Sequence, residues 1–227
     1  MKLKKYAAPF LAGLLAAVTV TSTASAHPYD YWQGLYLSKN DANIELYVLY
    51  TAQTELLTKE NVYDYATNWN NISSDVSVSV EYQNTILPNS NGKWIVAGRE
   101  FNNTNLGRMN PYDASGNLMD TTPGVNSDWS YVRIDINVDA EAFVDLKNGL
   151  ITPSKLITNA RKTFLHEVGH ALKLSHPKQN STLSGHTVSN GRPYAIMNQG
   201  YVRSSSDAVA PDIAYHDKIC LKTKWGV

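Results

Sequence analysis

The segment 166–176 carries the strongest chemical signal in the chain. His166, Glu167 and His170 form a His-Glu-x-x-His pattern, and another histidine, His176, follows six residues later. A helix turns about 100° per residue, so His166 and His170 lie one turn apart on one face and can bind the same metal ion. Glu167 points about 100° away, where it can contact a water on that metal but is poorly placed as a ligand. This pattern is a zinc signature of metallopeptidases.

The third histidine requires a break in the helix. On a continuing helix, His176 would lie about 9 Å beyond His170 along the axis. The chain is therefore expected to leave the helix around residues 172–174 and fold back, and Pro177 agrees with a helix that has ended. Three imidazoles with an open fourth position are typical of a catalytic zinc site. Such a site predicts peptide-bond hydrolysis by a zinc-activated water, with Glu167 as the general base.

These residues resemble the metzincin zinc peptidases, and most closely their matrixin-like branch. The family pattern is His-Glu-x-x-His-x-x-Gly-x-x-His, followed by a methionine-containing turn. The positions in register are His166, Glu167, His170 and His176. Residues 195–198, Ala-Ile-Met-Asn, resemble the Met-turn, which implies that Met197 forms a hydrophobic floor beneath the zinc ion. The resemblance is strong over residues 157–198.

One position departs from the family pattern. Lys173 stands where the family has glycine, whose left-handed backbone returns the third histidine to the metal. A lysine with positive φ costs about 1–2 kcal/mol, so either the strain is tolerated or the turn is remodelled. Further upstream, residues 106–109 followed by Pro111 resemble the edge strand along which matrixins lay an extended substrate.

Other ligand sets remain open. No glutamate follows Glu167, which excludes the zinc peptidases that use a downstream glutamate as third ligand. An aspartate could take that place, although such residues more often cap helices or lie at the surface. The aspartate candidates are Asp207, Asp212 and Asp217. A closed structural zinc site would need a fourth ligand, and the candidates are His186 and His216.

A function from another class is a catalytically silent module that keeps the fold and binds or adheres to a polymer. Glu167, the one residue of the signature with no role in holding metal, favours the enzyme. A second metal is a separate hypothesis. Asp113, Asn117 and Asp120 offer oxygen ligands in a polar loop and are candidate calcium ligands, with a solvated turn as the alternative.

Composition limits the class of protein. The chain has 227 residues, a formal net charge of zero and 18% charged residues, which argues against a nucleic-acid partner. Cys220 is the single cysteine, so no intramolecular disulfide framework is expected. The length allows one domain with a short extension.

The N-terminal end has the pattern of a secretory signal. Residues 1–26 combine an early cluster of lysines, an apolar run and a final Ala-Ser-Ala. We therefore expect a secreted, extracellular catalytic domain of residues 27–227 that acts on protein or peptide substrates. We expect it to be a monomer without stable membrane insertion. Residues 27–42 form either part of this domain or a removable pro-segment.

The hydrophobic patterns predict a mixed α/β (α+β) order in one domain. Loops are expected to dominate residues 102–128, which are rich in Asn, Gly and Pro. Strands are expected over 44–50, 76–80, 94–97 and 131–138, and helices over 58–72, from Thr152-Pro153 onward and near 211–221. The metzincin resemblance implies a twisted, mostly parallel sheet with an active-site helix, the Met-turn and a C-terminal helix.

Overall fold

The computed structural model describes a set of ranges within the chain. These are residues 31–32, 42–49, 58–83, 93–99, 106–119, 126–137, 152–177, 194–200, 202 and 209–226. The predicted signal at 1–26 lies outside the described residues, as does most of the segment 27–42. None of the described helices has the length and apolar character that crossing a bilayer requires.

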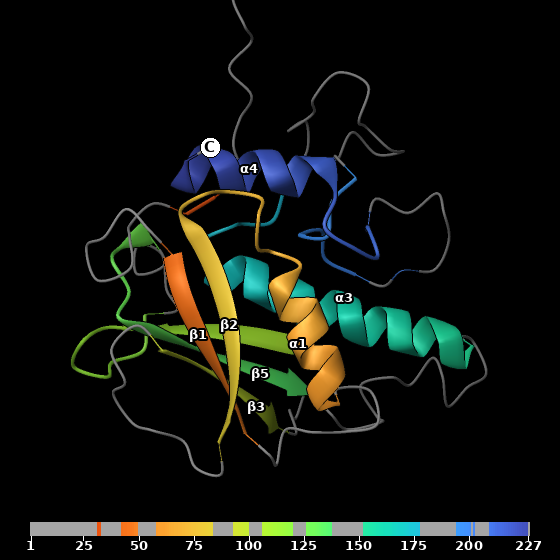
Figure 1. Cartoon of the computed structure of the whole chain (residues 1–227), viewed down its shortest axis with the longest axis horizontal. Coiled ribbons are helices and arrows are strands. Elements are labelled where there is room, and N and C mark those ends of the chain that lie inside the picture. Colours follow the sequence, from red (N-terminus) through yellow and green to blue (C-terminus); the bar gives the residue numbers. More distant parts are fainter. Residues whose placement is uncertain are drawn as a thin grey trace, which may run out of the picture.

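The described strands form one five-stranded sheet in the order β2-β1-β3-β5-β4 (Figure 1). They are β1 (Ala42–Leu49), β2 (Val76–Gln83), β3 (Lys93–Arg99), β4 (Gly107–Tyr112) and β5 (Tyr131–Asn137). All neighbours pair in parallel except β4, which runs antiparallel to β5 at one edge. The expectation of a mixed α/β fold with a mostly parallel sheet is confirmed.

The edge strand β4 corrects one prediction and agrees with another. It lies inside residues 102–128, where the polar composition predicts mainly loops. Its hydrogen bonds come from pairing with β5, a partner distant in sequence that local propensity does not reveal. The strand includes most of the segment that resembles the substrate-binding edge of the matrixins.

Three helices lie in the described part of the chain, and a capping side chain marks the start of two of them. They are α1 (Lys59–Thr67), α3 (Pro153–Ala171) and α4 (Tyr215–Trp225). Thr58 and Thr152 each accept a hydrogen bond from a backbone amide three residues on, as predicted for N-caps. The helix predicted over 58–72 is shorter than expected, because the chain enters a turn with Asn71 at a φ of 62°.

The core lies between the sheet and the two helices α1 and α3. The helix α3 packs against β4 and β5, and α1 packs against β2 and α3 (Figure 1). The fully buried members include Leu46, Trp69, Ile134, Phe164 and Leu165. The Trp69 indole donates a hydrogen bond of 3.3 Å to the Leu165 carbonyl, which ties the turn after α1 to α3 directly before His166.

One position on the edge formed by β2 is covered by a side chain. Asn70 donates its amide to the Val78 carbonyl at 2.9 Å and accepts the Val78 amide at 2.6 Å. This pair of hydrogen bonds occupies, at Val78, the backbone groups that a neighbouring strand would use.

Candidate metal centre

The chain reverses direction directly after α3. The Lys173 amide donates to the His170 carbonyl and the Leu174 amide donates to the Gly169 carbonyl, each at 2.9 Å. Lys173 has a φ of 70°. These are the two hydrogen bonds and the left-handed residue of a Schellman cap. The helix ends where the sequence predicts, and the left-handed turn is retained with lysine in place of glycine.

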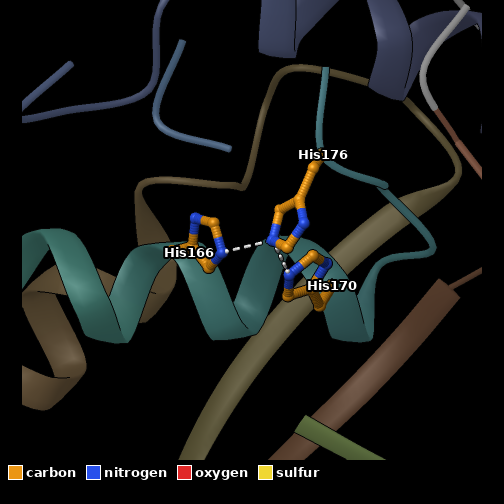
Figure 2. Close-up of side chains that lie close together, drawn as sticks. All are labelled: His166, His170 and His176. Atoms are coloured by element: carbon orange, nitrogen blue, oxygen red, sulfur yellow. Dashed lines mark hydrogen bonds between the residues drawn. The ribbon is translucent and has the colours of Figure 1, made fainter. Parts of the chain in front are cut away.

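The turn brings the three histidine rings together (Figure 2). His176 Nε2 lies 3.1 Å from His166 Nε2 and 2.9 Å from His170 Nε2. Among the described residues, these three form the one group of His, Cys, Asp or Glu side chains close enough to share a metal ion, with ligand atoms within 4.8 Å of one another. A tetrahedral ion with Zn–N bonds of about 2.0–2.1 Å separates its nitrogen ligands by about 3.3 Å. The spacing of the rings is close to that requirement.

Backbone carbonyls fix which ring nitrogen faces the centre. His166 Nδ1 lies 2.8 Å from the Ile196 carbonyl, and His170 Nδ1 lies 2.8 Å from the Leu174 carbonyl. A carbonyl only accepts hydrogen bonds, so each Nδ1 carries the proton and each Nε2 offers a lone pair to the centre. This arrangement is typical of metal-binding histidines.

Burial keeps these imidazoles neutral. It holds the pKa of His166 well below the ordinary value, and the nearby Lys162 lowers that pKa further. Burial, followed by the neighbouring His176, lowers the pKa of His170 to about 3. Neutral imidazole is the form that binds metal, so His166 and His170 do not need to lose protons at neutral pH.

Glu167 is buried beside the edge strand. Burial raises its pKa to about 8, while Lys162 and the Met109 backbone amide, which donates to the carboxylate, act in the opposite direction. A Cβ at Gly107 would lie 2.8 Å from Glu167 Cγ, so glycine allows the helix to approach β4 this closely. The carboxyl group is thus held between α3 and the edge of the sheet.

Lys162 is a neighbour of this centre that the sequence analysis missed. Its Nζ lies 3.4 Å from His166 Nδ1. Burial lowers its pKa to about 8, and Glu167 and Asp217 oppose that effect. The available signal was the spacing, since Lys162 lies four residues before His166 on the same face of α3.

The segment 195–198, which we call the Met-turn after its resemblance in sequence, packs against α3 at Gly169. Met197 is buried, and a Cβ at Gly169 would overlap its Sδ. The Asp217 carboxylate accepts hydrogen bonds from the amides of Ile196 at 2.9 Å, Met197 at 3.3 Å and Ala214 at 2.8 Å. The last of these bonds also caps α4 and explains why that helix begins at Tyr215, later than predicted.

None of the competing ligands that the structure describes belongs to the three-histidine group. Asp217 is engaged with the Met-turn, and Asp212 accepts a hydrogen bond of 2.6 Å from Arg161. His216 is buried on α4 with Nε2 at 3.5 Å from Cys220 Sγ. Asp207 and His186 lie outside the described residues.

The candidate calcium ligands gain no support. Asp113 accepts hydrogen bonds from the Ser115 and Asn117 amides, each at 2.8 Å, and from the Asn117 side chain at 2.9 Å. These hydrogen bonds, with the Asn117 side chain first, lower the pKa of Asp113. The carboxylate therefore organises its own turn, and Asp120 lies outside the described residues.

The segment 31–32 lies against the same turn. The Trp32 ring stacks on His170 with centroids 5.0 Å apart and an interplanar angle of 17°. The Trp32 amide donates to the Lys173 carbonyl at 2.7 Å, and Tyr31 forms an antiparallel bridge with Leu174. These two residues are partly buried and pack against the core beside the centre.

Comparisons with known proteins add one likeness. No protein-family model matches the chain, and no curated protein matches it in sequence. Among solved structures, the crystal structure of archaemetzincin from Methanopyrus kandleri is similar, at 10% sequence identity and a TM-score of 0.41. The similarity covers 82% of this chain and 97% of that one. At this level, function has to be inferred from the geometry of the chain's own residues.

Proposed function

We propose that this protein is a zinc-dependent endopeptidase of the matrixin-like type. His166, His170 and His176 hold the zinc ion, and Glu167 is the general base. The observation that carries this proposal is the convergence of three imidazole Nε2 atoms beside a buried carboxyl group. The donor set fits zinc because neutral imidazoles oriented by backbone carbonyls are ligands that zinc prefers.

The mechanism divides the work between the ion and Glu167. Zinc, when bound, supplies a Lewis acid that polarises a peptide carbonyl and lowers the pKa of a water. Glu167 accepts a proton from the attacking water on a carboxylate oxygen and passes it to the nitrogen of the leaving amine. A nearby divalent cation lowers the pKa of this carboxyl group from about 8, which favours the basic form.

The proposed substrate is an extended peptide that pairs with the outer edge of β4 near Gly107, since the Pro111 carbonyl already accepts the Met119 amide at 2.8 Å. This strand ends the sheet and lies next to α3, where Glu167 contacts the Met109 amide. An extended peptide adds to such an edge through main-chain hydrogen bonds, which places its carbonyl groups near the carboxylate.

We also propose that the protein is secreted and that residues 1–26 are removed. The contacts of Tyr31 and Trp32 with the turn after α3 support retention of the chain from Tyr31 onward in the active form. N-terminal sequencing of the exported protein tests both points. A mature N-terminus beyond Trp32 would contradict the retention of this segment.

The experiment that tests the activity is hydrolysis of an unfolded protein by the purified, zinc-loaded chain. Glu167→Gln is the matched variant, since it keeps shape and hydrogen bonding but cannot accept the proton. We expect a loss of about 10²–10⁴-fold in kcat with zinc binding retained, and abolition of cleavage by a chelator. Zinc binding by a folded chain that shows no cleavage would overturn the peptidase and favour the silent binding module.

A further inference from the structure

Lys173 occupies a place that is unfavourable for lysine in two respects. Its φ of 70° lies in the left-handed region that favours glycine, and its side chain is fully buried. A buried amine also loses its hydration. Both disadvantages at one position indicate that the side chain makes contacts that a glycine could not.

The first contacts join the turn after α3 to the segment before β5. Lys173 Nζ donates a hydrogen bond of 2.7 Å to the Ser127 carbonyl. The same Nζ lies 3.4 Å from the centroid of the Trp129 ring, which is itself fully buried. The left-handed turn is thus tied through its side chain to two residues of another segment.

The next contacts continue from Trp129 to a histidine. The Trp129 ring meets the Trp32 ring edge to face, with centroids 5.8 Å apart and an interplanar angle of 61°. Trp32 stacks on His170, and its amide donates to the Lys173 carbonyl. The contacts from Lys173 through Trp129 and Trp32 to His170 form a ring, because the Lys173 amide also donates to the His170 carbonyl.

We propose that Lys173 is a positioning residue for the three-histidine centre. Through Trp129 and Trp32 it holds the plane of the His170 ring, and through its backbone it sets the path by which His176 returns. Glycine would allow the same turn but would lack the side-chain contacts with Ser127 and Trp129. The inference rests on the proposed function insofar as the three histidines bind zinc.

Two substitutions separate the contributions of Lys173. Lys173→Gly removes the side chain and relieves the left-handed backbone, and Lys173→Met keeps an unbranched side chain, one atom shorter, but loses the amine. Asn71→Gly is the matched control, since Asn71 also has a positive φ, 62°, but lies in the exposed turn after α1. Unfolding of the metal-free proteins establishes which variants fold.

The measurements are zinc affinity, by competition with a chromophoric chelator, and the visible spectrum of the cobalt-substituted protein. We expect Lys173→Gly to bind zinc about 10–100-fold more weakly than the wild type, as typically follows when a partner outside the ligand sphere is lost. We also expect its cobalt bands to shift. Lys173→Met should change both readouts in the same direction, and Asn71→Gly should change neither.

Wild-type zinc affinity and cobalt spectrum in both Lys173 variants would overturn the proposal. If Lys173→Gly does not fold, Lys173→Met alone decides by the same criteria. These readouts do not depend on cleavage. A wild type that binds zinc but does not cleave peptides refutes the peptidase and leaves the positioning role intact. If the His166→Ala variant binds zinc as tightly as the wild type, both the peptidase proposal and the positioning role of Lys173 are refuted.

Discussion

The buried carboxylate of Asp217 accepts a hydrogen bond of 2.9 Å from the backbone amide of Ile196. The carbonyl of the same Ile196 lies 2.8 Å from His166 Nδ1. The helix α4 therefore orients a histidine of the centre through a single residue of the Met-turn. No side chain of α4 needs to contact the three histidines for this effect.

Substitution Asp217→Asn should therefore weaken both the fold and the centre. One of the two oxygens becomes an amide that cannot accept the backbone hydrogen bonds of the Met-turn. We expect a loss of about 2–3 kcal/mol in the free energy of unfolding, measured with denaturant on the metal-free protein. Zinc affinity should fall as well, and an unchanged affinity would contradict the link through Ile196.

Substitution Gly169→Ala should destabilise the protein although alanine favours helices. At an exposed helical site this change stabilises by about 1 kcal/mol. Here the new Cβ overlaps Met197 Sδ and lies 3.0 Å from Trp69 Cζ2. Overpacking of this kind costs about 1–3 kcal/mol, which thermal or denaturant unfolding can measure.

A double-mutant cycle identifies the cause of that loss. Met197→Ala removes the overlapping sulfur, so the cost of Gly169→Ala should be smaller in this background. Equal costs in both backgrounds would show that Met197 does not press on Gly169.

The stability of the metal-free protein should depend on pH through Lys173. Burial lowers the pKa of Lys173 from 10.5 to about 6. Between these values the unfolded chain holds a proton that the folded chain lacks, so this residue stabilises the fold increasingly as pH rises. The limiting slope for one group is about 1.4 kcal/mol per pH unit.

Lys173→Met provides the comparison for this pH effect, because it removes the titrating amine. We expect the wild type to gain stability relative to Lys173→Met between pH 7 and pH 9, by about 1–3 kcal/mol in denaturant unfolding. The opposite trend, or parallel pH profiles, would show that the amine is protonated in the folded state.

Zinc should stabilise the folded protein, since the three histidines converge only after folding. At a free zinc concentration of 100 times Kd, the gain is about 2.7 kcal/mol, visible as a higher Tm that a chelator reverses. His176→Ala should remove most of this gain. A full zinc-dependent shift in that variant would mean that zinc binds elsewhere.

Local signals in the sequence predicted the parts of the fold that depend on near neighbours. Thr152 and Pro153 mark the start of α3, and the spacing of His166 and His170 predicts that they share a face. The start of α4 was placed too early, because it depends on a carboxylate that also binds the Met-turn.

The surroundings of the centre could not be predicted from the sequence. Trp32 and Trp129 are nearly a hundred residues apart, and both lie far from His170 in the chain. Only the folded sheet and the reversal after α3 bring them together. Similarly, the sequence predicts that Lys173 is strained or remodelled, but its partner Ser127 depends on tertiary structure.

The Asn70 side chain makes its hydrogen bonds at the β2 edge of the sheet. At β2, its amide engages the Val78 backbone groups and so discourages another molecule from adding a strand there. The extended peptide that we propose as substrate would therefore meet less competition from β2 at the opposite edge, formed by β4. A peptidase of the proposed kind would work among unfolded chains, and Asn70 would make β2 less open at Val78 to the strand addition that leads to fibrils.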